Sequence, residues 1–189
     1  NHGRGPPRGP VLTGPNAPYI LQNREIGEFE RRKDWRGLLE YAKRTKGGFN
    51  DVNWGTTFSK LGRFRRERRD ITRDPRFRSF LVGLEGRIED INFGSRHLSN
   101  IVHALGVMGA RSDAVIRYVE DKAERIAAEG EPQEISNISY AFAKLGEKGA
   151  TRWFGALERE SVVQKLVWER GSTQAMSNTI WARATLGLK

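Results

Sequence analysis

The chain has 189 residues, a formal net charge of +10 and no cysteine. The lack of cysteine excludes a disulfide framework, a Cys-ligated zinc site and a cysteine nucleophile. No apolar run approaches the roughly 18 residues of a membrane-spanning helix, and the positive charge favours a polyanionic partner, nucleic acid before membrane.

The first eighteen residues have the composition of a disordered basic arm. They hold five Pro, four Gly and two Arg, Arg4 and Arg8, without hydrophobic periodicity. An arm of this kind cannot order itself, so we expect a large ribonucleoprotein particle, or alternatively crystal packing, to hold it. We expect residues 1–33 to form the arm and a lead-in, and residues 34–189 to form one helical-repeat domain.

Residues 34–45 predict the first helix, with Asp34 as its N-cap. Its inner face would carry Trp35, Leu38, Leu39 and Ala42. It would be the second helix of a degenerate repeat, or a cap for the stack.

Four segments then share one pattern, which predicts four equivalent helices. They read DVNWGTTFSKLG (51–62), LSNIVHALGVMG (98–109), ISNISYAFAKLG (135–146) and MSNTIWARATLG (176–187). Each has Asn nine residues before its final glycine and Leu or Met directly before that glycine. The glycines are 47, 37 and 41 residues apart, which is typical of a helical-hairpin solenoid.

The third segment shows the helix signals most clearly. Pro132 suits the first turn, and Gly146 suits a left-handed C-terminal position. Between them lies an apolar stripe with helical spacing, formed by Ile135, Ile138, Phe142 and Leu145.

Residues 63–78 form an arginine stripe, with eight arginines against three acidic residues. Guanidinium groups bind phosphate bidentately and stack on bases, so the stripe predicts phosphate contact. The alternative is a solvated, partly self-paired face. The arginines are Arg63, Arg65, Arg66, Arg68, Arg69, Arg73, Arg76 and Arg78.

Partner helices are predicted over residues 74–88, 113–128 and 151–167. The last should bury Trp153 and Phe154, because an exposed pair of that size favours aggregation, and it should also turn Leu157 and Val163 inward. The fourth repeat helix has no partner helix in the sequence, so further chain or another molecule would have to cover it. We therefore expect an all-α, right-handed α-solenoid with repeats beginning near residues 50, 95, 132 and 173, the last incomplete.

The third and fourth repeats resemble octotricopeptide repeats. PQEISNISYAFAKLG and TQAMSNTIWARATLG are similar to that family's signature helix, Pro-Gln-x-Leu-Ala/Ser-Asn-x-x-Trp-Ala-x-Ala-x-Leu-Gly, much of which heptatricopeptide and FAST-kinase-like repeats share. Trp181 takes the tryptophan position, which Tyr140, His103 and Thr56 occupy in the other repeats. The resemblance implies an α-solenoid of mitochondria or plastids that binds organellar RNA. It is fair in the second repeat, loose in the first and absent from residues 1–33, and no segment resembles the RAP domain that ends many members.

Residues at fixed positions beside the apolar stripes are candidate RNA contacts. The four Asn residues either face bases or bond a neighbouring backbone in an inter-repeat ladder; they are Asn53, Asn100, Asn137 and Asn178. Tyr140 and Trp181 either stack on bases or pack between hairpins. Lys60 and Lys144 are the stronger candidates for RNA contact.

Nothing in the sequence supports catalysis, and we expect no metal, cofactor or small-molecule substrate. His97 and His103 are six residues apart, which does not align two ligands on one helix face, and no Gly-rich phosphate loop follows a predicted strand. We expect a non-catalytic RNA-binding protein of the mitochondrion, or alternatively the plastid. In this interpretation it is an rRNA-binding structural component of the organellar ribosome, beside other proteins. The alternatives are an organellar mRNA processing, stability or translation factor and a protein–protein scaffold.

Overall fold

The computed structural model describes residues 14–168 and 172–188, and within them it contains twelve α-helices, one 3-10 turn and no strand. The prediction of an all-α protein is therefore confirmed. No helix in this part of the chain combines the length and the apolar character that a membrane span requires.

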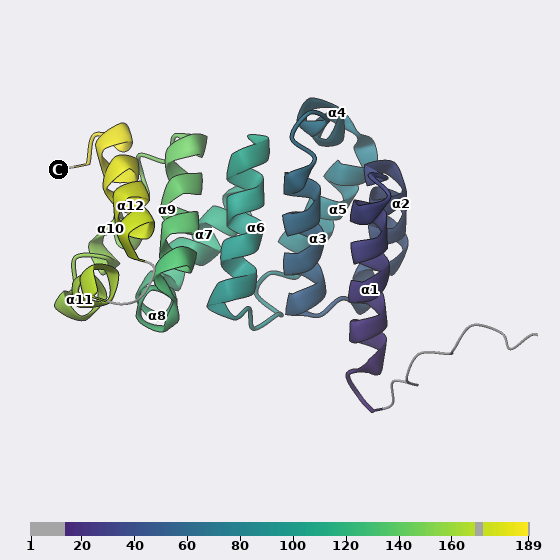
Figure 1. Ribbon diagram of the computed structural model, residues 1–189, viewed down its shortest axis with the longest axis horizontal. Helices are drawn as coiled ribbons and strands as arrows, with labels where there is room; N and C mark the ends of the chain where they lie inside the picture. Colours follow the sequence, from purple (N-terminus) through teal and green to yellow (C-terminus); the bar gives the residue numbers. More distant parts are fainter. Residues whose placement is uncertain (1–13, 169–171, 189) are drawn as a thin grey trace, which may run out of the picture.

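Five helices lie side by side in one row, which we call the front layer (Figure 1). They are α1 (Ala17–Arg31), α3 (Asp51–Arg63), α6 (Ser95–Met108), α9 (Pro132–Leu145) and α12 (Ser172–Leu186). The last four contain the four Asn-to-Gly segments of the sequence. Each of those segments thus forms a helix that neighbours the next along the row.

Six further helices form a back layer behind this row (Figure 1). They are α2 (Trp35–Thr45), α5 (Pro75–Glu85), α7 (Asp113–Asp121), α8 (Ala123–Glu129), α10 (Thr151–Ala156) and α11 (Glu160–Trp168). The 3-10 turn (Lys46–Gly48) follows α2, and the short helix α4 (Arg68–Arg73) lies in the arginine stripe between α3 and α5.

Helix α1 falls within residues 1–33, where the sequence had indicated only an arm and a lead-in. Within this helix only Ile26 is buried, so its apolar stripe is too weak to read from the sequence. Polar contacts dock it instead: the Asn53 side-chain amide donates to the Tyr19 carbonyl oxygen and to Asn23 Oδ1, both at 3.0 Å. Helix α1 is therefore an additional front helix, which precedes α3 in the row.

Three of the four repeat glycines end their helices in the left-handed conformation. Their φ angles are 66° at Gly109, 72° at Gly146 and 70° at Gly187. Gly62 differs from these three, because α3 continues through Gly62 to Arg63 and the buried Phe64 follows as its C-cap. Gly62 instead allows a close approach, since a Cβ atom there would lie 3.2 Å from the Cβ of Ala104 on α6.

Two predicted partner helices are each broken in two. The segment over residues 113–128 divides into α7 and α8 at Lys122, whose φ and ψ are −106° and 13°. The segment over residues 151–167 divides into α10 and α11. Because the break changes the helical register, Val163 is 43% exposed, whereas the sequence pattern had placed it in the core.

Aromatic packing joins the two layers at the N-terminal end of the domain. Trp54 and Phe58 of α3 both stack on Phe80 of α5, with ring centroids 4.7 and 5.0 Å apart. All three side chains are fully buried. This cluster ties the first repeat helix to its partner across the long insertion that contains the arginine stripe.

The outer face of α12 is uncovered among the described residues. Ser177, Ile180 and Ala184 are exposed there, and Ile180 is 60% exposed. The residues at the same positions relative to the repeat glycine are buried in α6 and α9; they are Ser99, Val102 and Gly106, and Ser136, Ser139 and Ala143. The next helix in the row approaches Gly106 through Ala141 and bonds Ser136 through Asn178, whereas Ser139 bonds Trp153 of α10.

Trp153 provides a test of the packing between the layers. It is fully buried and Phe154 is 3% exposed, as the sequence predicts, and the Trp153 indole N–H donates to Ser139 Oγ at 3.0 Å. Trp153→Ala should lower the free energy of unfolding by about 3–5 kcal/mol, because it leaves a cavity and removes the hydrogen bond from the indole to Ser139. The measurement is urea denaturation followed by circular dichroism.

The matched control is Trp181→Ala, since Trp181 is 45% exposed and its loss should change the unfolding free energy by less than about 1 kcal/mol. Similar losses for the two variants would contradict this assignment of burial.

Candidate nucleic-acid interface

Three side chains from consecutive front helices form a row of stacked rings, which we call the aromatic row. His103 and Tyr140 have ring centroids 5.8 Å apart, and Tyr140 and Trp181 have centroids 5.6 Å apart, with interplanar angles of 34° and 30°. Each residue lies six positions before the glycine of its repeat. Equivalent positions on adjacent parallel helices therefore bring the rings together.

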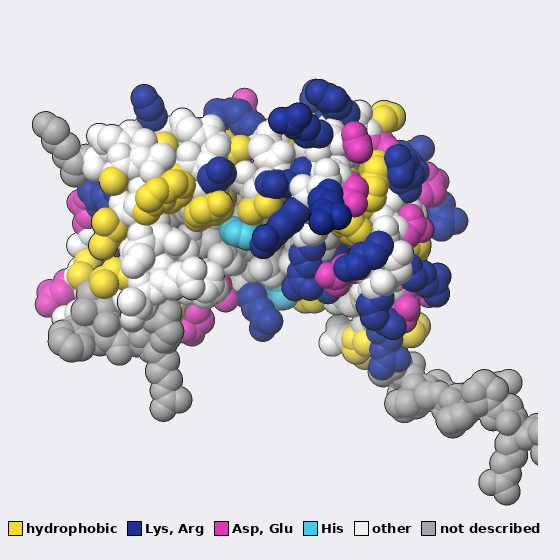
Figure 2. Space-filling view, turned by 45° about the horizontal axis from the view of Figure 1, so that its top comes forward, with side chains coloured by type: hydrophobic (Ala, Val, Ile, Leu, Met, Phe, Trp, Pro, Cys, Tyr) yellow, Lys and Arg dark blue, Asp and Glu magenta, His cyan; other side chains and the backbone are white. Residues whose placement is uncertain are grey.

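A groove runs along the same face, and we call it the front groove. Its lining combines aromatic, amide and cationic side chains from α6, α9, α12 and the start of the arginine stripe. The residues are Arg65, Arg68, His103, Val107, Gln133, Asn137, Tyr140, Gln174 and Asn178. Figure 2 shows a line of hydrophobic side chains on this face that leads to a histidine and to a cluster of Lys and Arg side chains.

The four repeat Asn residues differ in their surroundings. Asn53 is fully buried and bonds α1, and the Asn178 side-chain amide donates to Ser136 Oγ on α9 at 3.1 Å. These two link neighbouring helices. Asn137 is half-buried in the front groove, where its Oδ1 accepts from Gln133 at 2.9 Å. Asn100 lines an adjacent hollow between α3, α6 and α9.

Three arginines of the stripe are held by the fold. Arg63 pairs with Glu30 at 2.8 Å. Arg68 donates to the carbonyl oxygen of Val107 at 2.8 Å, where it satisfies a backbone group in the last turn of α6. Arg76 pairs with Asp74 at 2.7 Å, and its hydrogen bonds lower the pKa of the Asp74 carboxyl below its usual range.

The other five arginines of the stripe are exposed, and none pairs with an acidic side chain in the described part of the chain. They are Arg65, Arg66, Arg69, Arg73 and Arg78. Arg65 reaches the front groove, whereas Arg78 lines a separate hollow between α5 and α7. The stripe is therefore not one continuous surface, and its first part is the part that adjoins the aromatic row.

The two lysines singled out in the sequence differ in their surroundings. Lys144 is exposed near the end of α9. Lys60 is half-buried and forms an ion pair with Glu30. Burial would raise the pKa of Glu30, but the hydrogen bonds from Lys60 and Arg63 outweigh it and hold this pKa below its ordinary value. Arg4 and Arg8 lie outside the described residues.

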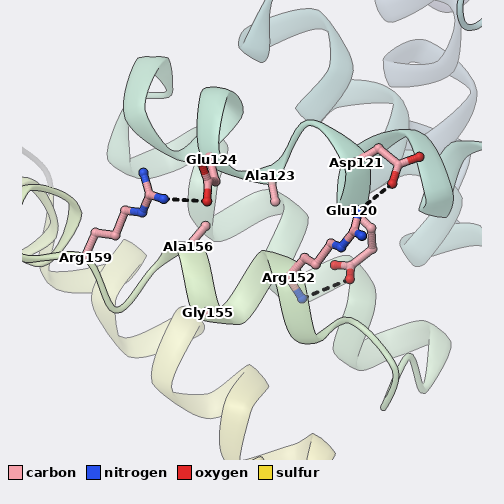
Figure 3. Close-up of a pocket in the computed structure, with 8 residues that line it drawn as sticks. All are labelled: Glu120, Asp121, Ala123, Glu124, Arg152, Gly155, Ala156 and Arg159. Carbon is pink, nitrogen blue, oxygen red and sulfur yellow. Dashed lines mark hydrogen bonds and ion pairs between the residues drawn. The ribbon is translucent and has the colours of Figure 1, made fainter.

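A hollow on the back layer is the main alternative to the front groove (Figure 3). It lies between α7, α8 and α10, and its charged groups satisfy one another. Arg152 pairs with Asp121 at 2.8 Å, the Arg152 backbone N–H donates to Glu120 at 3.0 Å, and Arg159 pairs with Glu124. These contacts hold adjacent hairpins together, so we interpret this hollow as an inter-repeat junction.

Within residues 14–168 and 172–188, no group of three or more His, Asp or Glu side chains is placed to hold a metal ion. Comparisons with protein-family models, with curated proteins and with solved structures gave no match. Function is therefore inferred from the geometry of the front layer and from the sequence resemblance described above.

The electrostatics of the front groove can be tested at His103. Burial lowers the pKa of this imidazole, whereas an unfolded chain binds the proton at about pH 6.5. Below that pH the unfolded state holds more protons, so stability falls as the pH is lowered toward the folded-state pKa. In urea titrations at pH 7.5 and 5.5, wild type should therefore lose more stability than His103→Gln.

The difference between the two proteins isolates the imidazole, because all other titrating groups are common to both. An equal loss of stability in both proteins would show that His103 titrates alike in the folded and unfolded chains.

Proposed function

We propose that this protein is a non-catalytic, single-stranded RNA-binding protein whose hairpins form a right-handed α-solenoid. The observation that carries the proposal is the convergence of three kinds of side chain in the front groove: stacked rings, side-chain amides and exposed arginine. Unpaired bases stack on aromatic rings and offer their edges to amides, while arginine contacts phosphate. The solenoid is supported by the single row of front helices and by the repeated sequence signature.

The resemblance to octotricopeptide repeats extends the proposal to the protein's location in the cell. It supports an organellar location, in the mitochondrion or alternatively the plastid. There the protein would be an rRNA-binding structural component of the ribosome, in contact with other proteins of that assembly. A role in organellar mRNA processing, stability or translation uses the same groove and remains the alternative within this class.

A protein–protein scaffold is the alternative from another class. The uncharged, exposed positions on the outer face of α12 favour it, because the equivalent positions on α6 and α9 are contact surfaces. The exposed arginines beside the aromatic row favour RNA. Fluorescence anisotropy with a labelled single-stranded RNA, at several salt concentrations, separates the two. A scaffold of net charge +10 would bind RNA only nonspecifically and lose it as the salt rises, whereas binding in the front groove should also depend on Trp181.

The arginines next to the groove should determine the salt dependence of RNA binding. We expect the triple variant with Gln at Arg65, Arg66 and Arg69 to bind more weakly at moderate salt. Each phosphate contact on a single strand adds about 0.7 to the slope of log affinity against log salt, so the slope should flatten by about two. The loss should be similar across RNA sequences, because phosphate contacts carry no base information. Arg68 is left intact because it bonds the end of α6.

The matched control replaces Arg24, Arg44 and Arg117 with Gln, which removes the same charge from exposed sites outside the stripe. Both variants should keep the wild-type helical circular dichroism. If they change the salt slope equally, the effect is one of net charge and the assigned surface is wrong.

The aromatic row should contribute to affinity without contributing to the salt slope. Trp181→Ala should weaken binding about 5- to 100-fold, since stacking of one base on an aromatic ring is worth about 1–3 kcal/mol. Trp181→Phe should recover much of this affinity, and Val163→Ala serves as a control for an exposed apolar residue of the back layer. Unchanged affinity in Trp181→Ala would place the RNA elsewhere.

A further inference from the structure

Four of the five front helices end in the same hydrogen-bonded turn. In each, an N–H group bonds the carbonyl oxygen five residues earlier, at 2.9 to 3.1 Å; the donors are Asp34, Ala110, Glu147 and Leu188. The residue before each donor has a left-handed backbone. It is glycine at the ends of α6, α9 and α12, but at the end of α1 it is Lys33, with φ of 58°.

Lysine is unfavourable at this position. A side chain forces Cβ against the backbone in the left-handed region, which is why glycine is the default residue there. Lys33 is the one residue other than glycine with positive φ in the described part of the chain. The fold therefore tolerates local strain at Lys33 that a glycine would remove.

Lys33 lies at the edge of a hollow that we call the α1–α3 hollow. It is lined by Lys33 and by Arg63, Arg65 and Arg66, around Phe64, with Glu30 and Glu67 as its acidic members. Glu30 already pairs with Arg63 and with Lys60. Neither Lys33 nor Arg65 nor Arg66 forms an ion pair among the described residues, and the lining as a whole holds four cations against two carboxylates, so positive charge is in excess there.

We propose that the α1–α3 hollow binds a phosphate group and that Lys33 is one of its ligands. Glu67 offsets only part of the charge of Lys33, Arg65 and Arg66, and a phosphate would relieve the remaining repulsion and accept their hydrogen bonds. The strained lysine then has a function, because glycine would provide the same turn without the charge.

The hollow is a neighbour of the front groove, since Arg65 lines both. The phosphate is accordingly a group of the RNA in the groove, either an internal phosphodiester or a terminal phosphate. The assignment of this phosphate to RNA rests on the proposed RNA-binding function. The binding of phosphate in the hollow does not depend on that function.

Lys33→Gly and Lys33→Arg separate the charge from the backbone. Lys33→Gly should raise the melting temperature by about 2–4 °C, because it relieves the left-handed strain, and Lys33→Arg should not. Lys33→Gly should also weaken binding of a labelled single-stranded RNA about two- to fivefold at moderate salt and reduce the salt slope by about 0.7. Lys33→Arg should keep the wild-type affinity and slope.

Two RNA oligonucleotides that differ only in a 5′-phosphate or a 5′-hydroxyl distinguish the two sources. If the ligand is an internal phosphodiester, Lys33→Gly should weaken the binding of both oligonucleotides alike. A terminal phosphate predicts that wild type prefers the 5′-phosphorylated strand and that the variant loses the preference. A Lys33→Gly protein that is more stable and binds both strands as wild type does would overturn the proposal.

Inorganic pyrophosphate tests the site without RNA. In an NMR titration of the wild-type protein it should shift the backbone amides of Lys33 and of residues 63–67, and Lys33→Gly should weaken this response. If wild type binds no RNA while pyrophosphate gives these shifts, the proposed function fails and the phosphate site stands. If RNA binds in the front groove but pyrophosphate leaves these amides unchanged, the phosphate site is rejected alone.

Discussion

The close approach of neighbouring front helices is the constraint on which the candidate interface depends. A Cβ atom at Gly106 would lie 2.6 Å from the Cα of Ala141, so α6 and α9 meet where neither has a large side chain. Interhelical distance depends on the residues at the contact. With larger residues there, the helices would move apart and the ring centroids of His103 and Tyr140, now 5.8 Å apart, would separate. The small residues therefore position the aromatic row without belonging to it.

Local signals explain why much of the fold could be predicted from the sequence. Asp34 and Asn50 cap the helices that follow them, Pro132 lies in the first turn of α9, and Gly146 ends that helix. These effects act within a few residues, so the chain records them directly. Helix α1 escaped prediction because its contacts with α3 are polar and join groups some thirty residues apart. No periodicity in α1 itself reports such contacts.

The sequence predicted where the residues of the candidate site lie better than it predicted what each of them contacts. Alignment on the repeat glycine places His103, Tyr140 and Trp181 at equivalent points, which is sufficient to expect them on one face. It does not reveal that Arg68 would reach the carbonyl of Val107, because the two groups come within hydrogen-bonding distance only when α4 folds against the end of α6. Tertiary contacts separate Arg63 and Arg68 from the other arginines that have no acidic partner, and the sequence pattern does not record such contacts.

The distribution of charge along the front layer gives its two ends different chemistry. Exposed arginines lie at the end formed by α3 and α4, whereas the outer face of α12 exposes Ser177, Ile180 and Ala184 without a charge. Two front helices, α6 and α9, separate α3 from α12 in the row (Figure 1). A protein contact on α12 would thus leave the arginine end of the front groove accessible, and the RNA-binding and scaffold hypotheses do not exclude each other sterically. The two hypotheses differ in the salt dependence that they predict, because of the two surfaces only the arginine end can release counterions from a polyanion.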